Sequence, residues 1–139
     1  MFRSNSFYII YEVMIIDSHC HAWKIWPYLP QVPDPENHGS IELLLNKLTL
    51  NNVDLATIVC AEIFNNFNNN SYVYEKIKCY PDKFLQLADI DSMWSKTYHT
   101  SGAANRLEKA MNKYNILGFT HYVAKEDDAS WFNSSDGLD

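Results

Sequence analysis

The feature that most constrains the fold of this chain is a regular alternation of short apolar runs with segments of helix length. The apolar runs lie at residues 13–17, 55–61, 84–90 and 118–123. Short continuous apolar runs are typical of strands that are buried on both faces of a parallel sheet. Parallel strands need a crossover between them, and the intervening segments are long enough to supply one. The pattern therefore predicts an α/β protein with a parallel sheet.

Amphipathic helices are predicted in three of the connections. Ser40 is a suitable N-cap, and the helix that follows it is expected to end near Asn51. A second helix is predicted over 70–79 and a third over 103–114. The side chains expected to face the core recur at helical spacing: Ile41, Leu44, Leu45 and Leu48, then Val73 and Ile77, then Ala104, Leu107, Met111 and Tyr114.

Three further segments are predicted to be loops. Residues 22–39 hold four of the chain's five prolines, which predicts a long connection without a helix interior, anchored by its aromatic side chains. The Asn-rich segment 65–70 predicts an ordinary polar turn. The acidic tail, residues 124–139, is also expected to be loop-like.

Length, composition and charge limit the classes of function. The chain has 139 residues, the length of one domain, and its 47% hydrophobic and 20% charged content is that of a globular protein. A net charge of −6, with no cluster of Lys and Arg, argues against binding to a nucleic-acid backbone. A small anionic substrate stays compatible, because it needs only one or two local cations.

The cysteines and the amino terminus indicate a cytoplasmic protein. Three cysteines without CxxC spacing favour neither a disulfide framework nor a zinc knuckle, and they suit a reducing compartment. No apolar run is long enough to cross a bilayer, and the amino terminus lacks the features of a signal peptide. Met14 is an alternative start to Met1, which would make residues 1–13 an N-terminal extension.

The segment Asp17-Ser18-His19-Cys20-His21, directly after the first predicted strand, carries the sharpest chemical signal. In an extended backbone alternate side chains share a face, so Asp17, His19 and His21 are expected to point the same way and Cys20 to pack on the other side. Two imidazoles at this spacing can reach one metal ion. The carboxyl end of a strand is also where parallel α/β folds place their active sites. The alternative is an incidental polar strand end.

Residues 14–23, MIIDSHCHAW, resemble the opening of the amidohydrolase-related family, whose members end their first strand with an I-D-x-H-x-H-x-W pattern. Three later stretches extend the resemblance through residue 123: NVDLATIV at 52–59, CYPDKFLQLADID at 79–91 and ILGFTHY at 116–122. This family consists of metal-dependent hydrolases with a TIM-barrel fold. The resemblance therefore implies that residues 14–139 form the amino-terminal half of a TIM (β/α)8 barrel, with about four β/α units.

The resemblance also implies a chemistry. Relatives hydrolyse lactones or amides, or carry out a related decarboxylation, on small organic acids. A divalent ion, zinc or manganese, would be held by His19 and His21, with Trp23 and His121 as candidate substrate-binding residues. Family members take further His ligands and a catalytic Asp from later strands, so the general base is expected beyond residue 139. The partners expected are a small-molecule substrate and either a second copy or the missing carboxyl-terminal half.

Several alternatives stay open at this stage. The chain could be a half-barrel without activity of its own that acts through association, or a TatD-type nuclease, although the acidic charge and the Trp after the His pair disfavour a nuclease. His121 could instead be a half-buried residue with a backbone partner, and Trp23 could serve only to pack the long loop. His38 and His99 are expected to be exposed. Asp89 and Asp91 are interpreted as loop caps rather than as a metal or phosphate site.

Overall fold

The computed structural model describes residues 13–124 and 129–135. Four strands form one sheet in the order in which they occur along the chain, and each pairs in parallel with the next. They are β1 (Ile16–Cys20), β2 (Leu55–Val59), β3 (Phe84–Asp89) and β4 (Gly118–Thr120). The predicted α/β class with a parallel sheet is confirmed. The extension predicted for residues 1–13 lies, apart from Val13, outside the described residues.

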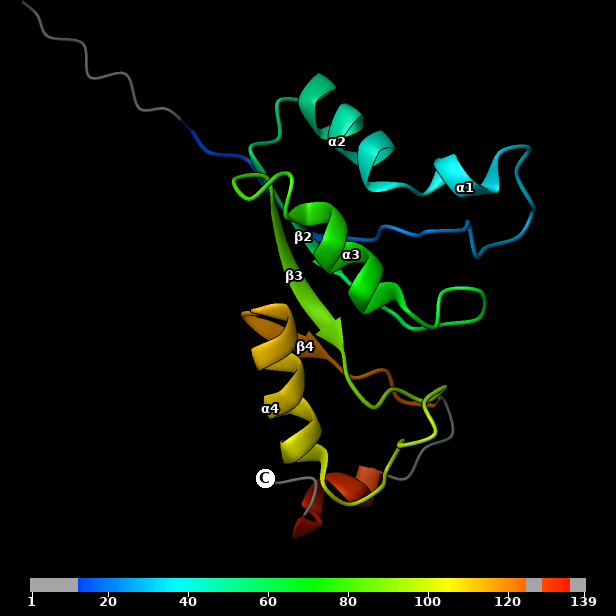
Figure 1. Ribbon diagram of the computed structural model, residues 1–139, viewed down its shortest axis with the longest axis vertical. Helices are drawn as coiled ribbons and strands as arrows, with labels where there is room; N and C mark the ends of the chain where they lie inside the picture. Colours follow the sequence, from blue (N-terminus) through cyan, green and yellow to red (C-terminus); the bar gives the residue numbers. More distant parts are fainter. Residues whose placement is uncertain (1–12, 125–128, 136–139) are drawn as a thin grey trace, which may run out of the picture.

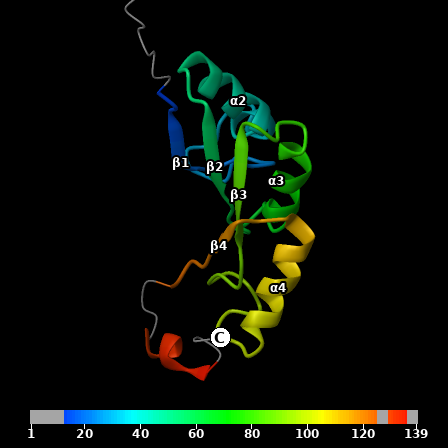
Figure 2. The same cartoon turned by 90° about the vertical axis from the view of Figure 1, so that its left-hand side faces the viewer.

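Each of the first three strands is followed by a helix that crosses back over the same side of the sheet (Figures 1 and 2). These helices are α2 (Ile41–Leu50), α3 (Asn69–Ile77) and α4 (Ala103–Tyr114). Ser40 caps α2 as predicted, because its side chain accepts a hydrogen bond from the backbone N–H of Leu43. None of the helices in the described part of the chain is long and apolar enough to cross a membrane.

The main core lies between β2, β3 and the first two of these helices. Ile41 of α2 and Val73 of α3 are fully buried against Ala56 and Ile58 of β2 and Phe84 of β3. Alternate residues of the two central strands thus face the helices. The apolar runs predicted burial on both faces, but the residues between the buried ones are only half-buried. A second, smaller cluster joins α4 to β3 through Ala110 and Ala88, with Ile116 beside them.

The predicted burial of β1 is wrong, and the predicted core face of α4 is correct only in part. β1 begins three residues after the start of the predicted run, and Val13, Met14, Ile15 and Ile16 are exposed rather than buried. Their apolarity does not bury them, because β1 is an edge strand with a neighbour on one side only. In α4, Ala104 and Met111 are exposed, whereas Tyr114 packs against the smaller cluster as predicted. That helix has two adjacent apolar stripes, and it packs through the stripe that contains the small Ala110.

Two short helices occur where only loops were predicted. α1 (Pro35–His38) is a single turn inside the proline-rich connection, and η1 (Ala129–Asn133) is a 3-10 helix in the tail. Pro35 occupies the first turn of α1, where a missing N–H has no cost, and the Asp34 side chain caps the turn. High proline content therefore excluded a helix interior but not a helix start.

The three thiols are expected to differ sharply in reactivity. Burial raises the pKa of the Cys20 thiol to about 12, with the charge of Asp17 adding to the effect, and burial also raises the pKa of Cys60. Cys79 is exposed. At pH 8 an aromatic disulfide reagent should therefore modify one thiol per chain rapidly and the other two only after denaturation. Rapid modification of a second thiol in the folded chain would contradict this packing.

Candidate active site

The two histidines at the end of β1 meet as their spacing predicted. The Nε2 atoms of His19 and His21 lie 3.3 Å apart, and the Nδ1 atom of His21 lies 2.6 Å from the carbonyl oxygen of Val59 on β2. Because a carbonyl only accepts, Nδ1 of His21 carries the proton and its Nε2 holds a lone pair. The two facing nitrogens are close enough to share a proton or a cation.

The spacing of these nitrogens suits one shared ion. Two nitrogen ligands at the ~2.0–2.1 Å of Zn–N bonds lie about 3.3 Å apart in a tetrahedral arrangement. The hydrogen bond from His21 to Val59 is also the kind of outer contact that sets the tautomer of a ligating imidazole. Within residues 13–124 and 129–135, however, no third His, Cys, Asp or Glu joins them in a group that could hold a metal.

Asp17 does not join the His pair, contrary to the prediction. The register between β1 and β2 shifts, so that Asp17 pairs with Ala56 and Cys20 pairs with Ile58, two residues of the buried core. The simple alternation of faces is thereby interrupted. The Asp17 carboxylate accepts a hydrogen bond from the backbone N–H of His19, which fixes the turn of the chain before the pair. Cys20 packs against the core as expected.

An aromatic cavity borders His21. Trp23, only 2% exposed, stacks on the ring of His21 with 5.4 Å between centroids. A cavity of about 430 Å³ is lined by both rings and by Trp26, Tyr28 and His38, with Lys47 of α2 at its margin. His38 is exposed, as predicted. Trp23 also packs the long loop, since its backbone N–H donates to the carbonyl of Gly39. A Cβ at Gly39 would lie only 3.0 Å from the indole, so a larger residue there would require the indole to shift.

The Asn-rich segment contains the predicted polar turn at the exposed Asn65 and Asn68, but its other asparagines are buried and connect strands. Asn66 accepts from the backbone N–H groups of Lys24 and Ile25 and donates to the carbonyl of Ile25. Asn69 accepts from Ala61 and donates to Ala22. These two amides therefore join the loop after β1 to the end of β2 and hold the His pair in place.

Asn70 extends the same connection to β3. Its side-chain oxygen accepts from the N–H of Asp89 and its side-chain nitrogen donates to the carbonyl of Asp89, each at 2.8 Å. Asn66, Asn69 and Asn70 are at most 4% exposed. An amide side chain has the donor and acceptor of a peptide group, so it can continue a sheet's pairing where a strand ends.

Glu62, at the end of β2, is a titratable residue that the sequence analysis missed. It lines a small cavity of about 100 Å³ together with Asp89, Ser92 and Trp94. Burial, with the nearby charge of Asp89 adding to it, raises the pKa of the Glu62 carboxyl to about 7. Only the position of Glu62 directly after a predicted strand could have drawn attention to it.

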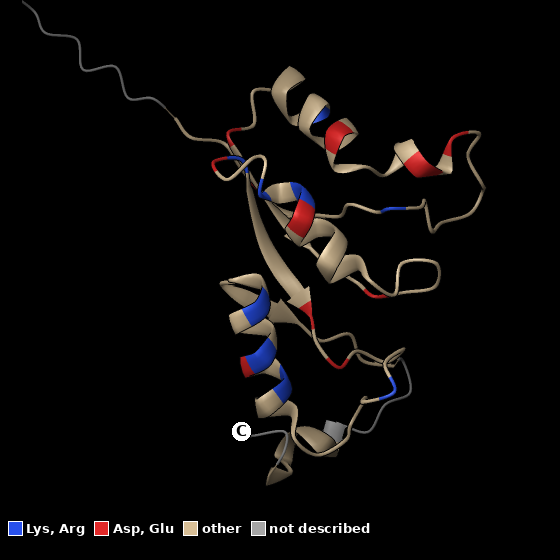
Figure 3. Cartoon of the chain, in the orientation of Figure 1, with Lys and Arg blue, Asp and Glu red and all other residues tan. Residues whose placement is uncertain are grey.

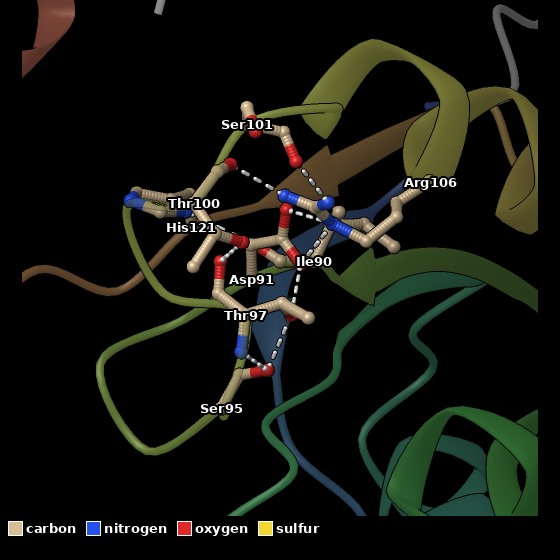
Figure 4. Close-up of polar contacts among 8 residues, drawn as sticks. All are labelled: Ile90, Asp91, Ser95, Thr97, Thr100, Ser101, Arg106 and His121. Atoms are coloured by element: carbon tan, nitrogen blue, oxygen red, sulfur yellow. Dashed lines mark hydrogen bonds and ion pairs between the residues drawn. The ribbon is translucent and has the colours of Figure 1, made fainter. Parts of the chain in front are cut away.

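Asp89 and Asp91 are loop caps, as interpreted. The Asp89 carboxylate accepts from the N–H of Glu62, the hydroxyl of Ser92 and the indole of Trp94. Burial raises the pKa of Asp89, although these three hydrogen bonds act in the opposite direction. Asp91 instead forms an ion pair with Arg106 (Figure 4). Both carboxylates are thus occupied by hydrogen bonds or an ion pair within the protein.

Replacing Glu62 with glutamine is expected to make folding less sensitive to pH. In the folded chain the pKa of the Glu62 carboxyl is about 7, well above its ordinary value of 4.5. Between pH 4.5 and pH 7 the folded chain therefore holds a proton that the unfolded chain has lost. The stability of the native chain should fall as pH rises through this window. At pH 8 the Glu62→Gln variant should be more stable than the native chain by about 1–2 kcal/mol. This difference is smaller than the pKa shift alone would give, because solvent reaches part of the carboxyl group. At pH 4 the two proteins should be nearly equal.

Urea unfolding at the two pH values measures this difference. Glu108→Gln on the exposed side of α4 is the matched control, and it should change stability by less than about 0.5 kcal/mol at either pH. A Glu62→Gln variant that is destabilised at pH 8 would show that the ionised carboxylate contributes to folding.

His121 lies in a stack of rings. Its Nδ1 lies 3.0 Å from the carbonyl oxygen of Ile90, while its Nε2 is buried and has no hydrogen-bond partner in the described part of the chain. Tyr98 and Trp131 lie parallel to its ring at 5.6 and 5.8 Å between centroids. His121 is thus half-buried with a backbone partner, the alternative considered above, and whether it also binds substrate stays a prediction.

His99 belongs to the same stack, which corrects the prediction that it is exposed. Its ring lies 4.3 Å from that of Trp131 and 4.0 Å from that of Tyr98. Trp131 belongs to the described tail segment, residues 129–135. The loop between β3 and α4, which carries His99, therefore meets this tail segment beside the end of β4. No local pattern could have predicted this contact.

Comparison with known proteins supports the fold. No family model matches the chain, and no curated protein matches it. Among solved structures, a probable 2-pyrone-4,6-dicarboxylic acid hydrolase from Acinetobacter baumannii, with citric acid bound, is similar with a TM-score of 0.58 and 18% identity over 91% of this chain. The chain has the fold of half a TIM barrel. Its four parallel strands in sequence order, with crossover helices after the first three, confirm the predicted fold class.

A second solved structure, 4-oxalomesaconate hydratase from Rhodopseudomonas palustris, is similar with a TM-score of 0.50 and 23% identity over 76% of this chain. The chain spans 43% of the length of the hydrolase and 40% of the length of the hydratase. Both names denote enzymes that act on small organic acids. At these identities the likeness establishes the fold.

Proposed function

We propose that this chain supplies the metal-binding half of a hydrolytic active site for a small organic acid, as in the amidohydrolase-related family. The observation that carries the proposal is the pair of imidazole nitrogens, 3.3 Å apart at the carboxyl end of β1. The names of the two similar structures, a hydrolase and a hydratase, support the same class of chemistry. The reaction proposed is hydrolysis of a lactone or amide, or a related decarboxylation.

His19 and His21 would hold a divalent ion, zinc or else manganese. Such an ion lowers the pKa of a bound water toward 7 and polarises a carbonyl group. His21 presents the lone pair of Nε2, because its Nδ1 donates to Val59, and Trp23 stacked on its ring limits rotation. These two contacts orient the His21 imidazole independently of any ion.

The aromatic cavity beside His21 is the proposed substrate-binding region. The rings of Trp26 and Tyr28 suit a planar acid, and Trp23 supplies a buried part of the cavity wall. Lys47, which also lines the cavity, can pair with the carboxylate of the acid. His121 is the second proposed contact. The general base is assigned to no residue of this chain, since the resemblance places it on a later strand of the barrel.

Metal binding tests the ligand assignment without a need for turnover. The chain is titrated with Zn²⁺ against a chelating dye, and separately with Co²⁺, whose visible absorption reports tetrahedral coordination. We expect a site that is lost, or at least about 10-fold weaker, in the His19→Ala/His21→Ala variant. His38→Ala is the matched control, because this exposed histidine borders the same cavity and lies outside the pair.

Equal zinc affinity in the native chain and the double variant would overturn the ligand assignment. Loss of binding in the His38→Ala variant as well would indicate nonspecific binding by surface imidazoles. Circular dichroism of each variant establishes that the fold is retained, so a loss of affinity is not confused with unfolding.

A further inference from the structure

His21 lies one residue past the end of β1, where the ladder of the sheet no longer holds the chain. The last paired residues of β1 and β2 are Cys20 and Ile58. A side chain is placed by its own backbone, so a ligand beyond a strand end depends on contacts other than the ladder. Those contacts decide whether the ring of His21 keeps the orientation that metal binding requires.

Asn69, the first residue of α3, supplies a cross-connection at this point. Its side-chain nitrogen donates to the carbonyl of Ala22 at 2.8 Å, and its side-chain oxygen accepts from the N–H of Ala61 at 3.0 Å. Ala22 follows His21 directly. Ala61 lies two residues after Val59, whose carbonyl accepts from the His21 ring. One amide thus joins the two segments that carry the ligand and its hydrogen-bond partner.

The bridge made by Asn69 is buried. The residue is 1% exposed, and it uses the acceptor and a donor of its amide on two backbone groups that no longer pair along a strand. Breaking either bond would leave a polar backbone group buried without a partner, at a cost of roughly 1–3 kcal/mol. The separation between the end of β1 and the end of β2 is therefore held firmly at the level of His21.

Asn66 fixes the next stretch of the same loop. It is completely buried, and its side-chain oxygen accepts from the backbone N–H groups of the two residues after Trp23. Because the ring of Trp23 stacks on His21, this contact acts on the ligand only through a neighbouring side chain. Asn69 acts more directly, on the residue next to the ligand.

We infer that Asn69 is a positioning residue for the proposed metal ligand His21. Its bridge keeps the backbone of His21 at the distance from β2 at which Nδ1 donates to the carbonyl of Val59, so that Nε2 faces His19. Removing an outer residue that orients a ligating imidazole typically weakens metal binding by about 10–100-fold. The inference rests on the function proposed above, because it assigns a role within the same site.

Zinc titration of two asparagine variants from one segment is the first test. Asn69→Ala should weaken Zn²⁺ binding by about 10-fold or more. Asn70→Ala is the matched control, because Asn70 is 4% exposed and also binds two backbone groups through its amide, but these belong to Asp89 at the end of β3. This control should lose stability and keep a zinc affinity within about 2-fold of the native value.

The tautomer of His21 provides a readout that needs no metal. Long-range ¹⁵N–¹H NMR spectra of the metal-free chain at pH 8 distinguish a proton on Nδ1 from a proton on Nε2. We expect the proton of His21 on Nδ1 in the native chain and in Asn70→Ala, as its bond to Val59 requires, and a mixture of both forms in Asn69→Ala. Circular dichroism checks folding, and Asn69→Leu, of similar side-chain volume, replaces an alanine variant that does not fold.

An unchanged tautomer in the Asn69 variant would overturn the inference. Equal losses of zinc affinity in the Asn69 and Asn70 variants would also overturn it, since general stability would then set the affinity. Native zinc affinity in the Asn69 variant would overturn the role of Asn69 and leave the proposed function standing. If the native chain bound no zinc, the proposed function would fail, and the NMR comparison would still decide whether Asn69 positions His21.

Discussion

Replacing Arg106 with methionine is expected to lower the free energy of unfolding by about 3 kcal/mol. The Arg106 side chain pairs with both oxygens of Asp91 at 2.9 and 2.7 Å and donates to the carbonyls of Ser101 and Thr100 (Figure 4). The Asp91 side chain is only 8% exposed. Methionine fills much of the same volume but leaves this carboxylate buried without a cation, which is the costly way to break an ion pair.

The position of Arg106 on its helix allows a matched control. Figure 3 shows that basic residues gather on α4, where Arg106, Lys109 and Lys113 lie. Lys109 is exposed, so Lys109→Met removes the same charge and should cost less than about 0.5 kcal/mol. Urea unfolding followed by tryptophan fluorescence compares the variants. Equal losses for Arg106→Met and Lys109→Met would mean that the general charge of α4, and not the pair with Asp91, is responsible.

The Arg106→Lys variant separates charge from geometry. Lysine keeps the cation but cannot donate to Asp91 and to two carbonyls at once, so its stability should lie between those of the native chain and Arg106→Met. The loop that Arg106 holds also carries His99, whose ring stacks on Trp131. We therefore expect Arg106→Met to release the stack around His121, with a change in near-UV circular dichroism below the unfolding midpoint.

Periodicity was sufficient for most of the fold. The helix after Ser40 begins at its predicted cap, and the helix at 103–114 has the bounds that its apolar spacing predicted, because these signals act within a few turns of helix. The first strand was predicted to begin too early because its burial depends on neighbouring strands, which a local pattern does not show. An apolar run such as residues 13–16 predicts burial, but burial also requires neighbours on both sides, and the edge position of β1 supplies only one.

The candidate site could be predicted only in part. The proximity of His19 and His21 follows from their spacing in one strand, and the structure confirms that these rings meet. The raised pKa of Glu62 depends on Asp89, which lies 27 residues later, and on packing that no local pattern encodes. The burial of His99 depends in the same way on Trp131 from the tail.

The prediction for the Asn-rich segment was incomplete, because its composition is that of an exposed turn while three of its asparagines are buried and bind backbone groups. Runs of Asn are common in exposed turns, since the side chain competes for backbone hydrogen bonds. Here the same capacity is directed at strand ends, where unpaired backbone groups of β2 and β3 need partners. The side chains that look least specific in the sequence therefore hold together the rim on which the His pair lies.

Replacing Asn70 with alanine should consequently destabilise the chain by about 3 kcal/mol. Its amide is the partner of both the N–H and the carbonyl of Asp89, and Asn70 is only 4% exposed. Alanine removes both partners and leaves two polar backbone groups buried, each at a cost of roughly 1–3 kcal/mol. Urea unfolding of the variant measures the loss.

Asn68 provides the control for this prediction within the same segment. It precedes α3, is exposed, and forms no capping hydrogen bond through its side chain, so Asn68→Ala should change stability by less than about 0.5 kcal/mol. A comparable loss of stability in both variants would contradict a special role for Asn70 and would mean that the asparagines of this segment contribute equally to stability, as in an ordinary turn. A loss confined to Asn70→Ala would establish that this amide extends the pairing of β3 past the end of the strand.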